Sequence, residues 1–376
     1  MHKRGIESYI LKDLSKKIVL LSGPRQVGKT TLAKKISKHF EYLNFDSSED
    51  RMTLIRKQWD RKKELLIFDE IHKMPKWKAW LKGIYDKEGI PPQILVTGSA
   101  KMDIAKKMGD SLAGRHFQYQ LFPFDLKELR AEERPEIIYE NLLKFSGFPE
   151  PYLTHQEGFY TKWRRSHLDL ILRQDLIDLE AVRDITSMET MTQLLQSKVA
   201  APFSYASISN DLQKDIKTVQ RWTNLLEQLY LVFKINTYSK NIARSILKEP
   251  KIYFYDYTRV EGGEGVKFEN VVAVSLKKEV AFLNEALGIE SNLHTLRMKG
   301  GREIDFLVTR QNLPELLIEV KLGDDSPSPN FKLFRNYFKG CKQIQLVKTL
   351  KRERTTEDGI EIRNALRWLT EMDLSV

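Results

Sequence analysis

Eight consecutive residues near the N-terminus combine glycine, lysine and threonine at the spacing of a loop that binds phosphate. They are Gly23, Pro24, Arg25, Gln26, Val27, Gly28, Lys29 and Thr30, and Thr31 follows them. The glycines allow backbone N–H groups to curl around an α- and a β-phosphate. Lys29 would reach the β- and γ-phosphates, and the Thr30 hydroxyl would bind Mg²⁺. The pattern therefore predicts a site for a nucleoside triphosphate.

A second pair of chemical groups follows another short apolar run. Residues 65–68 are Leu-Leu-Ile-Phe, and Asp69 and Glu70 come directly after them. A carboxylate at the end of a buried parallel strand is well placed to hold Mg²⁺ through water. The neighbouring carboxylate can take a proton from the attacking water as a general base. We expect Asp69 to bind the metal and Glu70 to act as the base.

Two further polar positions suit the γ-phosphate. A third apolar run, residues 93–97, ends near Ser99, and Ser99 is preferred to Thr97 as the residue that contacts the γ-phosphate, although periodicity cannot separate the two. Arg115 follows this strand and could neutralise transition-state charge, in its own subunit or in a neighbouring one. A salt-bridged surface arginine is the alternative for Arg115.

The elements that must position these groups alternate along the chain. Strands are expected at residues 18–21, 65–68, 93–97 and 116–121, and helices at 31–36, 79–85 and 104–108. Strands that alternate with helices favour a parallel sheet covered on both faces. The sequence thus predicts an α/β domain over residues 1–150, with the phosphate loop between the first strand and its helix.

These segments together resemble a known family. The chain is similar to the prokaryotic AAA-type ATPases that carry a GPRQVGKTT loop and a C-terminal domain of poorly defined function. The resemblance implies an AAA-type P-loop NTPase fold, ATP with Mg²⁺ as the ligands, and hydrolysis by Lys29 and Glu70. Arg115 matches a recurring arginine of the family. Members often form homo-oligomers in which an arginine acts across subunits, and the oligomeric state of this chain stays open.

Composition narrows the class of protein. With 376 residues, the chain has room for two or three domains at roughly 150 residues per domain. No apolar run approaches the roughly 20 residues that cross a bilayer, and no secretory segment is recognisable. Cys341 is the only cysteine, which excludes an intrachain disulfide and fits a reducing cytoplasm. The net charge of +11 favours anionic partners, and residues 1–150 carry 29 basic against 21 acidic side chains.

The middle of the chain, residues 151–250, suggests contact with DNA. Residues 161–183 are expected to form one long amphipathic connecting helix. Two short helices over 205–212 and 215–226, followed by an apolar strand over 230–235, match the plan of a winged helix. Its second helix would present four polar side chains to DNA: Lys217, Thr218, Gln220 and Arg221. The alternative is a winged helix that contacts only protein.

The last third, residues 251–376, carries a second group of acids. Strands over 302–308 and 316–321 are expected to form a hairpin. Since side chains alternate along a strand, Asp305, Glu319 and Lys321 can share one face. Two carboxylates can hold Mg²⁺, a lysine can orient water, and Glu269 from the preceding helix could complete the metal shell. Glu303 lies on the same strand face as Asp305, so either could bind the metal.

This arrangement resembles the PD-(D/E)xK nuclease superfamily, whose site is an Asp on one strand and Glu-x-Lys on the next. The resemblance implies an α/β restriction-endonuclease-like C-terminal domain in which Asp305, Glu319 and Lys321 are catalytic. The prediction is an ATP-hydrolysing protein that acts on DNA through its winged helix and a metal-dependent nuclease-like domain. The alternative is a nucleotide-switched binding protein whose C-terminal domain binds a partner without catalysis.

Overall fold

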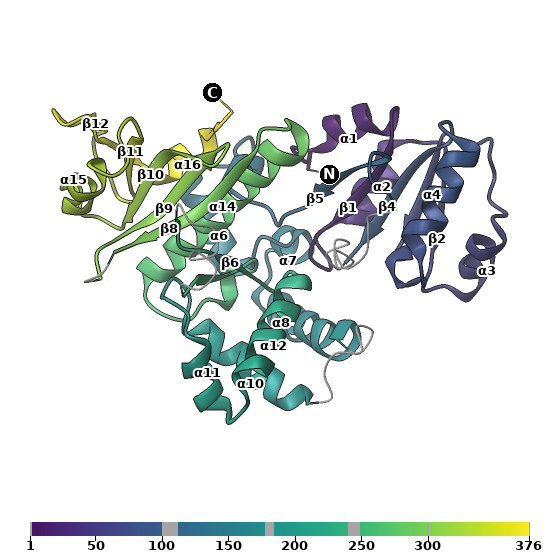
Figure 1. Cartoon of the computed structure of the whole chain (residues 1–376), viewed down its shortest axis with the longest axis horizontal. Coiled ribbons are helices and arrows are strands. Elements are labelled where there is room, and N and C mark those ends of the chain that lie inside the picture. Colours follow the sequence, from purple (N-terminus) through teal and green to yellow (C-terminus); the bar gives the residue numbers. More distant parts are fainter. Residues whose placement is uncertain (1, 100–111, 177–183, 240–248, 299–300, 376) are drawn as a thin grey trace.

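The computed structural model of the chain describes residues 2–99, 112–176, 184–239, 249–298 and 301–375. Figure 1 shows three parts: a sheet with β1 to β5 on the right, a second sheet on the left, and a helical part below them. None of the described helices is both long and apolar enough to span a membrane.

The first part alternates helices and strands. Along the chain its elements are α1 (Glu7–Leu14), β1 (Ile18–Ser22), α2 (Lys29–Ile36), β2 (Phe40–Asn44), α3 (Ser48–Arg56), β3 (Leu65–Asp69), η1 (Ile71–Lys73), α4 (Trp77–Glu88), β4 (Gln93–Gly98) and β5 (His116–Gln120). The five strands form one parallel sheet in the order β2-β3-β4-β1-β5. The predicted parallel α/β fold is confirmed. The helix expected at 104–108 lies outside the described residues.

Helices cover both faces of this sheet. Consecutive residues of β1 point to opposite sides, so Ile18 and Leu20 pack with Leu81 of α4 on one face. Val19 and its neighbour Leu21 belong to the core on the other face, with α1 and α2. A strand that is buried on both faces must be apolar throughout, which explains the uninterrupted run that precedes the phosphate loop. The carboxyl ends of β1, β3 and β4 meet at one edge, where the predicted nucleotide site lies.

The middle part is mainly helical. Its elements are α5 (Leu126–Leu129), α6 (Pro135–Phe145), α7 (Pro149–Thr154), α8 (Glu157–Leu170), η2 (Ile171–Asp175), α10 (Ile185–Gln196), α11 (Tyr205–Leu212), α12 (Ile216–Gln228), β6 (Val232–Ile235) and β7 (Lys251–Phe254). The long helix expected over 161–183 begins earlier, as α8, and passes into the π-helical turn η2. Its expected end, 177–183, lies outside the described residues. Strands β6 and β7 pair as an antiparallel hairpin. The boundary predicted between residues 250 and 251 would separate these paired strands, so the middle part continues through β7.

The last part is built on a second sheet. Its elements are η3 (Tyr257–Arg259), α14 (Glu264–Ala286), β8 (Ser291–Arg297), β9 (Glu303–Arg310), β10 (Leu313–Lys321), α15 (Pro329–Arg335), β11 (Lys342–Val347), β12 (Arg354–Thr355), β13 (Glu361–Asn364) and α16 (Ala365–Glu371). The sheet order is β12-β13-β11-β10-β9-β8. The expected hairpin is present as β9 and β10, and β11 then pairs parallel to β10. A large apolar core joins this sheet to the middle part, and α16 packs on α5 and α6.

Candidate functional site

The phosphate loop connects β1 to α2 with the backbone geometry that its glycines allow. Gly28 precedes α2 with a φ of 96°, and Gly23 has a φ of 149°. A Cβ atom on Gly23 would lie 2.3 Å from the carbonyl oxygen of Leu121, so no larger residue fits there. The buried Lys29 ammonium donates to the carbonyl oxygens of Gly23 at 2.9 Å and Pro24 at 2.7 Å. The lysine is thereby held at the mouth of the loop.

Other predicted residues of the loop have different roles. Val27 is fully buried in the core under the sheet, so it anchors the loop. Gln26 adopts a left-handed backbone with a φ of 59° and is exposed, as is Thr31. The side chain of Arg25 is partly exposed. The structure therefore gives the loop a buried anchor and an exposed rim.

Asp69, at the end of β3, is surrounded by three hydroxyl groups. Thr30 Oγ1 donates to Asp69 Oδ2 at 3.0 Å, and Tyr42 OH donates to the same oxygen at 2.7 Å. Thr97 Oγ1 donates to Asp69 Oδ1 at 2.5 Å. The threonine and the aspartate predicted to hold Mg²⁺ are thus adjacent, and their oxygen atoms are the donor type that Mg²⁺ prefers. These residues fit the metal that the fold implies.

Glu70 follows Asp69 and lies beside Ser99. The Ser99 N–H donates to Glu70 Oε1 at 3.0 Å, and Ser99 Oγ donates to Glu70 Oε2 at 3.3 Å. Burial, together with the nearby Asp69 charge, raises the Glu70 pKa to about 7, although Lys29 opposes the shift. His72 Nε2 lies 3.5 Å from Glu70 Oε2, and burial followed by the neighbouring lysines lowers the His72 pKa to about 4. A carboxylate with a pKa near neutrality is suited to general-base catalysis.

Sequence reasoning missed two residues that position Asp69. The sequence favours Ser99 over Thr97 only for contact with the γ-phosphate, and the structure gives the two residues separate partners. Thr97 donates to Asp69, and Ser99 donates to Glu70. Strand register could have shown this, because Asp69 and Thr97 are direct neighbours on β3 and β4. Tyr42 carries no comparable signal, since it lies on β2, a strand of mixed apolar and polar residues for which the sequence predicts no chemical role.

Arg115 lies far from the phosphate loop of its own chain. It precedes β5, whose first residue pairs with Ile18 at the start of β1, whereas the loop follows the end of β1. A five-residue strand separates these edges by roughly 15 Å at ~3.3 Å per residue. The guanidinium pairs with Asp86, at 2.6 Å from Nε to Oδ1. The predicted role of Arg115 within its own subunit is therefore wrong, and only a role toward another subunit stays as a prediction.

Residues from other parts of the chain contact the phosphate loop and the end of the strand that precedes it. Tyr230, just before β6, donates its hydroxyl to Ser22 Oγ at 2.8 Å. Pro149, at the start of α7, would lie 3.7 Å from a Cβ atom on Gly28. From the N-terminus, Arg4 Nη1 donates to the Val27 carbonyl oxygen at 3.3 Å. The loop is therefore in contact with the middle part as well as with its own sheet.

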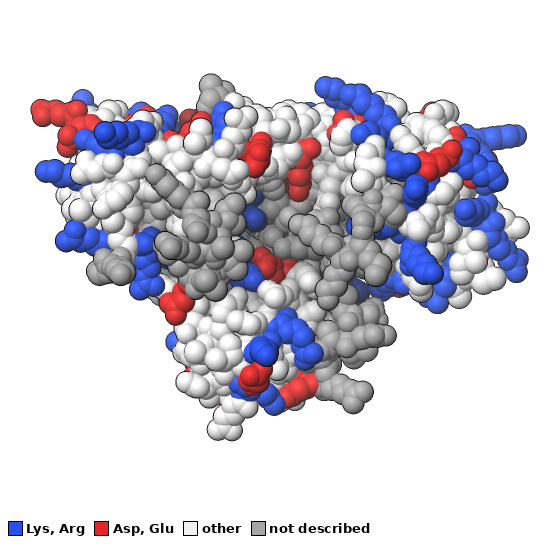
Figure 2. Space-filling view, in the orientation of Figure 1, with Lys and Arg blue, Asp and Glu red and all other residues white. Residues whose placement is uncertain are grey.

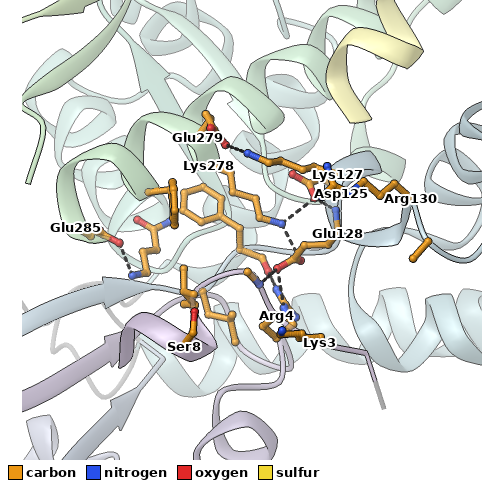
Figure 3. Close-up of a pocket in the computed structure, with 17 residues that line it drawn as sticks. Lys3, Arg4, Ser8, Asp125, Lys127, Glu128, Arg130, Lys278, Glu279 and Glu285 are labelled. Atoms are coloured by element: carbon orange, nitrogen blue, oxygen red, sulfur yellow. Dashed lines mark hydrogen bonds and ion pairs between the residues drawn. The ribbon is translucent and has the colours of Figure 1, made fainter. Parts of the chain in front are cut away.

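A charged pocket of about 380 Å³ lies between the first sheet and α14. Figure 3 shows Lys278 pointing between Asp125 and Glu128, at 2.9 and 2.8 Å. Arg4 Nε lies 3.2 Å from Glu128 Oε1. Burial alone would raise the Glu128 pKa, but the charges of Arg4 and Lys278 hold it well below its usual range. Because Arg4 also contacts Val27, this network links the phosphate loop to α14.

The acids predicted in the C-terminal part come together around two lysines. Val320 N–H donates to Asp305 Oδ2 at 2.8 Å, and Lys321 Nζ lies 2.8 Å from Glu319 Oε1. Burial, followed by the Asp305 charge, raises the pKa values of Glu269 and Glu319 well above their usual range. The structure thus brings Glu269, Asp305, Glu319 and Lys321 into one cluster.

The predicted metal shell is not formed by this cluster. Across the described part of the chain, no three His, Cys, Asp or Glu side chains are arranged to hold a metal ion. The ammonium of Lys251 lies there instead, 3.2 Å from Glu269 Oε1 and 3.7 Å from Asp305 Oδ1. Lys251 also lies 3.4 Å from Glu303 Oε1. The sequence left open whether Glu303 or Asp305 binds a metal, and in the structure both acids pair with Lys251. The metal assignment of Glu269, Asp305 and Glu319 is corrected accordingly.

The second helix of the predicted winged helix presents polar residues outward. On α12, Lys217, Gln220 and Arg221 are exposed and Thr218 is partly exposed, whereas Trp222 is buried. Figure 2 shows blue basic side chains on the lower, helical part of the molecule and, more densely, on the right-hand α/β part. Helices α11 and α12 and strand β6 lie where the sequence predicts two helices and a strand, and whether this unit is a winged helix stays a prediction.

Two family models match this chain. Residues 15–130 match a family model described as an AAA domain. Residues 137–258 match a domain of unknown function, DUF8612. The first match covers the parallel sheet and every residue predicted to contact nucleotide. Residues 15–130 therefore form an AAA-type P-loop domain.

The chain is also similar to proteins that are named as uncharacterised. The chain is 26% identical over 377 residues to an uncharacterised protein of Methanocaldococcus jannaschii, covering 88% of this chain and 81% of that protein. It is 25% identical over 243 residues to an uncharacterised protein of Mycobacterium tuberculosis, covering 64% of this chain and 54% of that protein.

Two solved structures are similar at low identity. A variant of Thermotoga maritima RuvB is 18% identical, with a TM-score of 0.33 and coverage of 61% of this chain and 87% of that one. The Aeropyrum pernix ORC1 protein, solved in complex with DNA, is 13% identical, with a TM-score of 0.34 and coverage of 75% and 94%.

Proposed function

We propose that this protein binds and hydrolyses ATP at the phosphate loop. The observation that carries the proposal is the hydrogen bond of 3.0 Å from Thr30 to Asp69, with Glu70 next to it at the same edge of the sheet. This arrangement joins Thr30, in the first turn of α2, to Asp69, the acid that ends β3. Both are needed around the phosphates of a P-loop nucleotide.

Each residue has a distinct part in the proposed reaction. Lys29 binds the β- and γ-phosphate oxygens, and the loop N–H groups bind the remaining phosphate oxygens. Mg²⁺, held by Thr30 and Asp69 when bound, neutralises negative charge on the phosphates. Glu70 accepts a proton from the attacking water, and Ser99 keeps its carboxylate oriented. ATP is preferred to other nucleotides on family resemblance.

Replacing Lys29 by Ala is expected to weaken nucleotide binding. The change removes charge-assisted hydrogen bonds of about 1.5–3 kcal/mol, so the Kd for ATP should rise roughly 10- to 150-fold. Titration with a fluorescent ATP analogue in the presence of Mg²⁺ measures this. Lys35→Ala, on the same helix, removes a lysine that pairs with Glu7 instead and serves as the matched control. Unchanged affinity in Lys29→Ala would place the nucleotide elsewhere.

We propose further that α10 to α12 and the strands β6 and β7 form a winged helix that binds DNA through α12. The support is the exposed face with Lys217, Gln220 and Arg221, where the charges suit a phosphate backbone. Among the described residues, neither Lys217 nor Arg221 has an ion-pair partner within 4.0 Å. The charged groups of both side chains can therefore contact DNA phosphates. The domain division then becomes an α/β part, a helical part ending with β7, and a C-terminal part.

The variant Lys217→Ala/Arg221→Ala is expected to bind DNA about tenfold more weakly, with a salt dependence reduced by about 2 in slope, because two phosphate contacts are lost. Fluorescence anisotropy with a labelled duplex across a salt series measures both quantities. Lys332→Ala/Lys339→Ala removes two exposed lysines from the C-terminal part and is the matched control. Equal losses in both variants would indicate a general charge effect and count against α12.

One observation favours the alternative role for the C-terminal part. Lys251 neutralises the acids that a metal-dependent nuclease would use, at 3.2 to 3.7 Å. We therefore propose that this part binds a partner or regulates the ATPase, and that it does not cut DNA as folded here. Incubation of DNA with the purified protein and Mg²⁺ or Mn²⁺ should leave the DNA intact.

A further inference from the structure

The ammonium of Lys251 lies in a buried group of carboxylates. Its side chain is only 4% exposed, and Nζ lies 3.2 Å from Glu269, 3.4 Å from Glu303 and 3.7 Å from Asp305. These acids come from α14 and β9, whereas Lys251 begins β7 in a different part of the molecule. Three carboxylates around one ammonium are the surroundings expected of a bound cation.

A fourth carboxylate increases the negative charge of the cluster. Glu319 is 4% exposed, and its Oε1 contacts Lys321 at 2.8 Å and Ser328 Oγ at 3.3 Å. Its other oxygen, Oε2, is buried without a hydrogen-bond partner. Four carboxylates thus share two ammonium groups, and burying such an excess is unfavourable unless cations offset it. Removing either lysine should therefore leave uncompensated negative charge in the cluster and favour the binding of a cation there.

We infer that Lys251 replaces a divalent metal ion in this cluster, so that the chain's own ammonium prevents metal binding there. The inference rests on the proposed non-cutting role of the C-terminal part and identifies the group responsible. A metal would need carboxylate oxygens at about 2.0–2.6 Å. The Lys251 ammonium lies 3.2 to 3.7 Å from the nearest oxygens of Glu269, Glu303 and Asp305. A dication held by these carboxylates would lie within a few ångströms of the Lys251 ammonium, and the two positive charges would repel each other.

The β6–β7 hairpin holds Lys251 in position. Lys251 pairs with Ile235 across the hairpin, and β7 packs on α14. Beyond Ile235 the chain continues along the edge of the second sheet, where Tyr238 N–H donates to the Thr295 carbonyl oxygen at 2.8 Å. The other end of the hairpin contacts the first sheet, since Gln120 Nε2 donates to the Tyr255 hydroxyl at 3.1 Å. The lysine therefore cannot leave the cluster unless the hairpin or its own side chain moves.

The test is a titration of the protein with Mn²⁺ in the absence of nucleotide. Electron paramagnetic resonance measures the free Mn²⁺ at each step and so gives the affinity. The wild type and Glu319→Gln are expected to bind Mn²⁺ equally, because the cluster does not take part. Lys251→Met is expected to bind at least about tenfold more tightly, since a competing charge about 4 Å away is removed. Adding Glu319→Gln to Lys251→Met should abolish the gain. Lys234→Met is the control: it removes an ammonium from β6, the strand that pairs with β7, and this ammonium pairs with Glu227 of α12. The control variant should bind Mn²⁺ as the wild type does.

Two results would overturn the inference. The first is Mn²⁺ binding by the wild type that is lost in Glu319→Gln, which would show that the cluster already binds metal. This comparison does not need a Lys251 variant, so it can be made even if Lys251→Met does not fold. The second is a folded Lys251→Met that gains no affinity. Phosphate release from ATP is measured on the same proteins as a separate readout. Failure of the ATPase proposal would appear there, while a change in Mn²⁺ binding concerns only the cluster.

Discussion

Replacing Glu70 by Gln is expected to lower the rate of ATP hydrolysis by about 100- to 10,000-fold while leaving ATP affinity close to that of the wild type. The amide keeps the shape of the side chain but cannot accept the proton of the attacking water. Phosphate release under single-turnover conditions, together with an ATP titration, separates these two effects. Loss of affinity without loss of the chemical step would contradict the role of Glu70 as a base.

The pH dependence should identify the same group. Only the ionised form of Glu70 can act as a base, and burial raises its pKa to about 7. In the wild type, kcat/KM is therefore expected to fall as the pH drops below about 7, because this parameter reports the free enzyme. The residual activity of Glu70→Gln should lack that acid limb. An acid limb retained in the variant would assign it to another group.

Stability provides a control on the same variant. A carboxyl whose pKa rises on folding, here from 4.5 to about 7, binds protons more tightly in the folded chain. Ionisation of Glu70 therefore reduces stability as the pH rises through that window, and the reduction is complete above it. Glu70→Gln should melt no lower than the wild type at pH 8.

Glu64→Gln is the matched control for hydrolysis. Glu64 lies just before the same strand, at the opposite end from Glu70, and accepts a hydrogen bond from Ser37. This variant should leave hydrolysis unchanged.

The second large effect is expected from Gly147→Ala. A Cβ atom at this position would lie 2.6 Å from the Phe124 carbonyl oxygen, 2.6 Å from Tyr257 Cε2 and 3.1 Å from Pro123 Cβ. The backbones cannot separate easily, because Phe124 N–H donates to the Gly147 carbonyl oxygen at 2.6 Å. Overpacking of this kind should lower the free energy of unfolding by about 3 kcal/mol.

Urea unfolding with a fluorescence readout measures the change. Gly83→Ala is the matched control, since nothing lies within 4 Å of its Cβ position in α4. There alanine should stabilise the chain by about 0.5–1 kcal/mol, because it favours the helix. Gly147 also precedes Pro149, which lies beside Gly28 of the phosphate loop. Folded Gly147→Ala should consequently bind ATP more weakly, whereas equal stability of both variants would refute the steric explanation.

Local patterns predicted the phosphate loop and the two acids of the candidate nucleotide site. The apolar run of β1, the glycines of the loop and the acids after β3 each lie within a few consecutive residues. Strands buried on both faces must be apolar, and carboxyl ends of parallel strands share one edge, so these patterns also place the groups in space. The AAA domain match over residues 15–130 agrees with that prediction.

The sequence could not locate Arg115, because the two ends of a strand look alike until strand direction and order are known. Its position at the amino edge follows from the parallel pairing of β5 with β1. Tyr42 was missed for a related reason: its hydrogen bond to Asp69 depends on β2 being the neighbour of β3. Both outcomes depend on sheet order, which hydrophobic periodicity does not encode.

The residues of this chain by themselves determined a P-loop, the acids at the end of β3 and a cluster of carboxylates on a hairpin, because each depends on short-range spacing and strand alternation. Only the tertiary structure decided what those carboxylates hold. Lys251 is separated by 52 residues from Glu303, and it approaches the acids because the β6–β7 hairpin packs on α14. Ion pairs between distant segments depend on how the parts pack, and the packing of buried surfaces leaves no periodic trace around the lysine itself.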